Sequence, residues 1–184
     1  MKEKENKSEN LKPLLKIARD AIESKFYDKE IYVNEEIKKK FSKKQSCFVT
    51  LTEDGMLRGC IGSLYASQEL WKDVVENAVH AAFHDYRFRP VSEREVDKVK
   101  IEVSVLSIPE KLGVGSEVFD KIDKKMGIIL EKSGASSTFL PQVWEQIKDK
   151  KNFLEELSMK AGLNKDAWKT AKLSFYRVEK VEEK

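Results

Sequence analysis

Residues 57–62, LRGCIG, bring together the side chains in this sequence that are best suited to chemistry. Arg58 and Cys60 stand two positions apart, and Gly59 and Gly62 flank the cysteine. A thiolate is a nucleophile, and a nearby guanidinium favours it over the neutral thiol. The pattern therefore predicts a reactive thiol, with Arg58 stabilising negative charge. The alternative is a tight corner of the core, because a free cysteine commonly packs as a small buried hydrophobe.

The two glycines indicate that another group approaches this segment closely. In a strand from Met56 to Gly62, unbroken alternation would place Arg58, Cys60 and Gly62 on one face. A glycine inside a strand often marks a bulge, or a place where another backbone or a ligand comes close. Gly59 and Gly62 are therefore candidate substrate-binding positions that clear space around the thiol.

A corner of charged and aromatic residues follows a helical pattern over residues 68–85. His84 is a candidate general base, and Asp85 beside it is a candidate assisting acid. Arg87 is a candidate for binding an anion or substrate, the alternative being a corner in which Asp85 and Arg87 satisfy backbone groups. His80 and His84 have the spacing of two ligands on one helical face but lack the glutamate of a zinc-protease motif, so we expect no metal site and no cofactor.

Two further candidate binding residues lie in other segments. Gln142 follows Leu140-Pro141, where a strand pattern meets a helix start and free N–H groups can receive an anion. An ordinary capped turn is the structural alternative there. Glu102 lies in the alternating pattern of residues 100–107 and is a candidate substrate-binding residue. The structural alternative is that an acid such as Glu102 simply pairs with Arg58.

The pattern of apolar residues predicts the elements that position these side chains. Apolar stripes predict helices over residues 11–26 and 68–85, and Asp54-Gly55 between two β-rich runs predicts a hairpin. Strand patterns recur at residues 100–107 and in a terminal strand over 172–181, without regular βαβ alternation. We therefore expect an α+β fold with a mostly antiparallel sheet and flanking helices. Residues 1–10 are polar and predict a disordered tail, which leaves one domain over 11–184.

Composition excludes several classes of protein. The 184 residues are 40% hydrophobic and 36% charged, with a net charge of +3 and apolar runs too short to span a membrane. The start, MKEKENKSEN, lacks the apolar core of a secretory signal, so we expect a cytoplasmic protein with reduced thiols. The one basic cluster, Lys38–Lys44, is more typical of a solvated helix end than of a nucleic-acid interface.

Taken in order, several segments resemble the AMMECR1-domain family: LRGCIG, HDYRFRPV, KIEVSVLS, GIILEKSGASSTFLPQVW and KLSFYRVEK. The resemblance extends from about Leu11 to Val181, and LRGCIG is the family's signature. It implies a larger and a smaller subdomain with a cleft between them near the signature. Tyr86 stands where the family usually has proline, and the turn at Gly134–Ser137 lacks the basic residue expected of an anion-binding loop.

The resemblance also implies a setting. Prokaryotic members are typically encoded beside a Memo-like protein and a radical SAM protein, which are the partners we expect. No biochemical activity carries over. We therefore expect a binding or accessory component that takes a partner or an anionic small molecule at a cleft centred on LRGCIG. A cysteine-dependent enzyme with Cys60 as nucleophile is the alternative, and a nucleic-acid-associated protein is a lesser one.

Overall fold

The structure, a computed structural model, describes residues 2–27 and 30–184, with side chains from residue 9 onward. The chain divides into two compact units: unit 1, Met1–Leu106 with Glu179–Lys184, and unit 2, Ser107–Val178. Both combine helices with antiparallel strand pairs, which confirms the α+β class and the larger and smaller subdomains. The cleft between the subdomains and the boundary at residue 10 stay predictions. Of the predicted tail, residue 1 and the side chains of residues 2–8 lie outside the described part.

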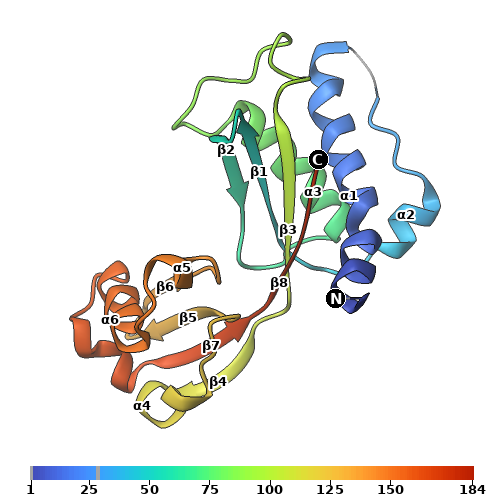
Figure 1. Cartoon of the computed structure of the whole chain (residues 1–184). Coiled ribbons are helices and arrows are strands. Elements are labelled where there is room, and N and C mark those ends of the chain that lie inside the picture. The colour runs from blue at the N-terminus through green and yellow to red at the C-terminus, as the bar shows by residue number, and fades with distance from the viewer. Residues whose placement is uncertain (1, 28–29) are drawn as a thin grey trace. The chain divides into compact units, whose positions relative to one another are not determined.

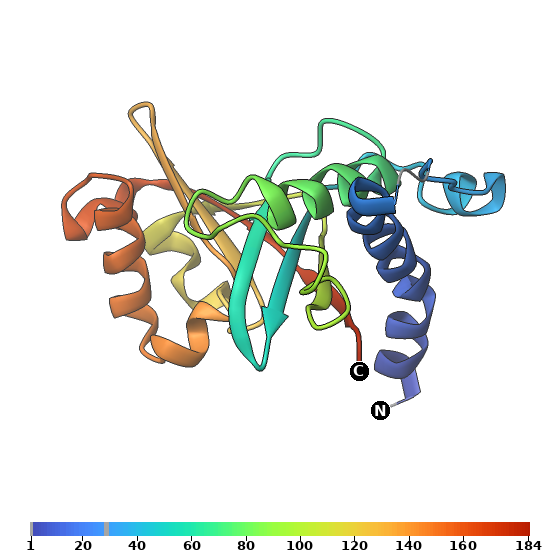
Figure 2. The same cartoon turned by 90° about the horizontal axis from the view of Figure 1, so that it is seen from above.

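Unit 1 is built on a four-stranded sheet in the order β2-β1-β3-β8. Its elements are α1 (Lys2–Tyr27), α2 (Glu35–Lys40), β1 (Cys47–Glu53), β2 (Met56–Gly62), α3 (Leu70–Phe83), β3 (Lys100–Leu106) and β8 (Val178–Glu182). Helices α1 and α3 pack against each other and lie on one face of this sheet (Figure 1). Seen from above, α3 runs across β1 and β2 (Figure 2).

Alternation along the strands decides which face the two helices cover. Residues at every second position of β1 and β3 are buried against α1 and α3: Cys47, Val49, Leu51, Ile101, Val103 and Val105. The residues between them point to the opposite face, where Thr50 and Glu102 are half-buried and Ser104 is buried. We call that second face the open face, since none of the described helices of unit 1 packs on it.

The β1–β2 hairpin is confirmed, and its loop has two residues. Glu53 pairs with Met56, and both Asp54 and Gly55 have positive φ, at 51° and 77°. Positive φ at both loop positions is the geometry for which Asp-Gly is favoured, because its twist matches that of the strands.

The unbroken alternation predicted for β2 is wrong. In the pairing with β1, Thr52 lies opposite Leu57 and Leu51 lies opposite Gly59, so the register skips Arg58. A bulge of this kind leaves one residue unpaired and re-aims its side chain. Arg58 is therefore separated from the row that Cys60 occupies.

Unit 2 is built on a second four-stranded sheet, in the order β4-β7-β5-β6. Its elements are β4 (Glu110–Val114), α4 (Gly115–Val118), η1 (Phe119–Lys121), β5 (Gly127–Lys132), β6 (Ala135–Phe139), α5 (Val143–Gln146), α6 (Lys150–Lys160), η2 (Lys165–Thr170) and β7 (Lys172–Tyr176). Its core gathers around Trp144 and Phe153, whose rings stack with centroids 3.6 Å apart.

Two details of the predicted elements differ from the structure. The terminal strand is not continuous: it divides at Arg177 into β7, in the sheet of unit 2, and β8, in the sheet of unit 1. The helix predicted over residues 11–26 is longer in the structure, because the lysines and glutamates that precede residue 11 are good helix formers and α1 begins at Lys2. In the described part of the chain, no helix has the length and apolar character needed to cross a membrane.

Candidate functional site

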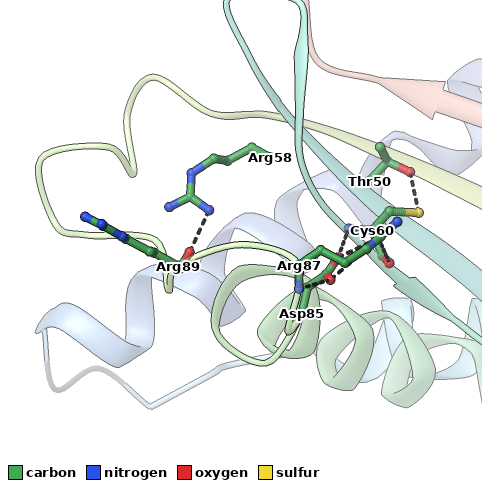
Figure 3. Close-up of polar contacts among 6 residues, drawn as sticks. All are labelled: Thr50, Arg58, Cys60, Asp85, Arg87 and Arg89. Carbon is green, nitrogen blue, oxygen red and sulfur yellow. Dashed lines mark hydrogen bonds and ion pairs between the residues drawn. The ribbon is translucent and has the colours of Figure 1, made fainter.

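The backbone of Cys60 is held from the side by Asp85 and Arg87. Strand β2 is an edge strand, so the outward N–H and C=O of Cys60 lack a neighbouring strand. The Cys60 N–H donates to Asp85 Oδ2 at 2.9 Å, and Arg87 Nη2 donates to the Cys60 carbonyl at 3.1 Å. The two side chains therefore supply the acceptor and donor that a further strand would have offered (Figure 3).

Asp85 and Arg87 also bind each other. Arg87 donates from Nε to Asp85 Oδ1 at 2.9 Å and from Nη2 to Oδ2 at 2.7 Å. The hydrogen bonds from Arg87 hold the pKa of Asp85 well below its usual range, with the Cys60 N–H adding to the effect, although burial opposes it. The same pairing raises the pKa of Arg87. Asp85, whose side chain is 1% exposed, is thus an ionised anchor for the corner.

Arg58 is committed to a different part of the chain. Its Nε and Nη2 donate to Glu95 Oε1, at 3.2 and 3.1 Å, and its Nη1 donates to the carbonyl of Arg89 at 2.7 Å. Nη2 also reaches the carbonyl of Pro90. Figure 3 shows the side chain extending toward Arg89 and away from Cys60. The acid that pairs with Arg58 is Glu95 and not Glu102, and Arg58 fixes the 89–95 segment against β2.

Glu95 completes this clamp. Its Oε2 accepts from both the backbone N–H and the hydroxyl of Ser92, at 2.8 and 2.6 Å, and the bond to the backbone N–H is the one that the glutamate of a capping box makes. These bonds from Ser92, followed by those from Arg58, lower the pKa of Glu95.

The thiol of Cys60 lies on the open face in a row of polar side chains. Thr50 is its partner across β1, and the Thr50 hydroxyl donates to Cys60 Sγ at 3.3 Å. Glu102 is the partner of Thr50 on β3, and Lys180 Nζ on β8 donates to Glu102 Oε2 at 3.0 Å. We call Cys60, Thr50, Glu102 and Lys180 the polar row. It sets a half-buried thiol, a hydroxyl, a carboxylate and an ammonium group across four strands.

The glycines of the motif are explained by close backbone approach. A Cβ on Gly59 would lie 2.1 Å from the carbonyl oxygen of Ala81 in α3, so only glycine lets the helix pack this closely on β2. A Cβ on Gly62 would lie 2.3 Å from the Cys47 carbonyl. Of the two readings of these glycines, the structure shows the backbone contact.

The remaining candidates lie apart from the polar row. His84 is the exposed C-cap of α3, its ring 5.3 Å from that of His80, and in the described part it has no hydrogen bond to Cys60 or Asp85. Gln142 is exposed at the start of α5 in unit 2. No group of three metal-binding side chains occurs among the described residues.

The second cysteine has a different environment. Cys47 is fully buried, and burial raises the pKa of its thiol well above its usual value. Its N–H donates to the buried Asp73 at 2.9 Å, and Asn77 donates to the same carboxylate at 2.9 Å. Asp73 near the start of α3 and Asp85 just past its end thus each bind the N–H of a cysteine on the hairpin.

Known proteins share both the sequence and the fold. The profile of the AMMECR1 family matches residues 15–181. The chain belongs to the AMMECR1 family. A relative from Nanoarchaeum equitans, Protein NEQ441, is 41% identical over 168 residues, which cover 89% of this chain and 93% of the relative. A protein from Aquifex aeolicus is 37% identical over 176 residues, covering 91% and 88% of the two chains.

A solved structure supports the same assignment. The crystal structure of the uncharacterised protein PH0010 from Pyrococcus horikoshii matches with a TM-score of 0.82 and 34% identity, over 96% of this chain and 93% of that one. The family and the fold are therefore shown. These relatives assign no reaction, so the function must be argued from the site.

Proposed function

We propose that this protein is an accessory component that binds a Memo-like protein, and acts with a radical SAM protein, through the open face centred on LRGCIG. The polar row carries the proposal. It presents four different polar groups on the open face. Figure 1 shows that α1 and α3 lie on the other face of this sheet. Family membership supports it, because such partners are implied for prokaryotic members. A cytoplasmic setting belongs to the same proposal, and the two free cysteines fit it.

The rigidity of β2 also supports a binding role. Asp85 and Arg87 form hydrogen bonds to the backbone of Cys60. The ion pair of Arg58 with Glu95 connects the preceding bulge to the 89–95 segment. Side chains fixed in this way lose little further entropy when a partner binds.

A partner titration with a variant in the polar row tests the proposal. Thr50→Lys places a long charged side chain at the centre of the row, where it would meet any docked surface. We expect it to weaken binding of the Memo-like protein from the same organism at least about tenfold, as for a buried charge at an interface. Lys25→Glu, on α1 and so on the covered side of the sheet, is the control. Equal affinities for wild type and Thr50→Lys by calorimetry, with both proteins folded, would refute the proposal.

A cysteine-dependent enzyme is the second candidate, and the Thr50 contact favours it. A hydroxyl that donates to sulfur stabilises a thiolate, which is the form that attacks electrophiles. This candidate requires Cys60 to react with iodoacetamide at pH 7 faster than free cysteine does. It also requires the rate of this reaction to fall several-fold in Thr50→Val. A rate that matches free cysteine in both proteins removes it.

A further inference from the structure

The two arginines near Cys60 differ in what they have left to donate. Arg58 uses all three of its nitrogens on Glu95 and on the carbonyls of Arg89 and Pro90, and its side chain is only 14% exposed. The Arg58 guanidinium is therefore fully engaged in hydrogen bonds within the chain. Its sequence position next to Cys60 does not make it available to a ligand.

Arg87 keeps a free nitrogen. Its Nε and Nη2 are occupied by Asp85 and by the Cys60 carbonyl, but within the described residues Nη1 has no hydrogen-bond partner. The side chain is 45% exposed, whereas that of Asp85, which fixes its direction, is 1% exposed. Because a guanidinium stays protonated in proteins, Nη1 offers two N–H groups to solvent in a fixed direction.

The guanidinium of Arg87 contacts the residue that carries the thiol. Arg87 Nη2 donates to the carbonyl of Cys60, so the guanidinium lies at the backbone from which Sγ projects. The acids around it have their own cations: Glu102 binds Lys180, and Glu95 binds Arg58. An incoming anion would therefore meet Arg87 without facing an unpaired carboxylate of the polar row.

We propose that Arg87 and Cys60 form a site for a small molecule bearing a carboxylate, which accepts from Arg87 Nη1 while the rest of the molecule lies over the thiol on the open face. The proposal deepens the binding role given above and rests on the same face. A carboxylate fits better than a phosphate, because one nitrogen supplies the free donors and the neighbouring Asp85 opposes a dianion.

Alkylation of Cys60 by a charged and a neutral reagent tests this site. Iodoacetate carries a carboxylate one carbon from the iodide that the thiolate displaces, and iodoacetamide is its neutral analogue. Both react with the thiolate, so the ratio of their rates cancels the thiolate fraction. Buried Cys47 does not compete in the folded protein. We expect the iodoacetate-to-iodoacetamide ratio at Cys60 to exceed that of N-acetylcysteine about fivefold at low salt, and to fall as salt rises.

Variants and competitors complete the test. Arg87→Gln is expected to bring the ratio down to that of N-acetylcysteine, while Lys25→Gln, with the same change of net charge, leaves it unchanged. In wild type, acetate, a carboxylate with a single charge, should slow iodoacetate more than an equal concentration of inorganic phosphate does. This comparison does not depend on the folding of any variant. Three results would each overturn the proposal. The first is a wild-type ratio equal to that of N-acetylcysteine, and the second is a Cys60 thiol that reacts only after the protein unfolds. The third is stronger competition by phosphate than by the carboxylate. None of these outcomes bears on the partner titration, so the two proposals fail separately.

Discussion

Replacing Gly59 with alanine is expected to lower the free energy of unfolding by about 3 kcal/mol, since a forced backbone shift exceeds ordinary overpacking. The added Cβ would lie 2.1 Å from the Ala81 carbonyl oxygen, and a backbone atom cannot turn aside as a flexible side chain can. Helix α3 would have to move off β2, and the Asp85 corner that follows the helix would move with it. Urea unfolding of the two proteins at pH 7 measures the loss.

Gly55→Ala is the matched control on the same hairpin. Gly55 has a φ of +77° but no atom within 4 Å of an added Cβ, so alanine there costs only backbone strain, about 1 kcal/mol. If Gly59→Ala were no more destabilising than Gly55→Ala, the close packing of α3 on β2 would be wrong.

Asp85→Asn is expected to cost about 2 kcal/mol at pH 7, because it leaves the Arg87 charge and the Cys60 N–H without their shared carboxylate. The cost is smaller than for a fully buried pair, because solvent screens the Arg87 side chain, which is 45% exposed. Asp54→Asn at the hairpin loop removes the same charge where asparagine also accepts a positive φ, and should change stability little.

The pH dependence of this effect has a definite sign. The pKa of Asp85 is depressed in the folded protein, so as pH falls the unfolded chain takes up the proton first. The stabilisation is complete above the unfolded pKa of about 3.9 and is lost progressively below it. The gap between wild type and Asp85→Asn should therefore be constant from pH 7 to about 5 and narrow toward pH 3. A gap that widens on acidification would contradict the assigned role of Asp85.

The fold was largely predictable because its signals are local. The Asp-Gly loop, the alternation in β3 and the apolar stripe of α3 each depend on residues close together in the sequence. The division of the terminal strand at Arg177 depends on which sheet each half joins, and nothing in the alternation itself marks that change.

The location of the candidate site was predictable, but its contacts were not. LRGCIG and the 85–87 corner do lie together, but it is Arg87, and not Arg58, that bonds to Cys60. The bulge that sends Arg58 to Glu95 is a matter of register, which is set by pairing with β1 and not by the spacing within β2. The contacts of Thr50 and Lys180 could not be predicted for the same reason, because each is made with a residue on another strand.

Protection of Cys60 in the complex tests the central claim most directly. The protein is treated with iodoacetamide alone and in the presence of saturating Memo-like partner, and the rate of modification at Cys60 is followed by mass spectrometry. If the open face is the binding surface, the bound partner should slow modification at least about tenfold, because the thiol would be covered at the centre of the interface. A complex that forms while Cys60 reacts at its unbound rate would place the partner elsewhere and contradict the account.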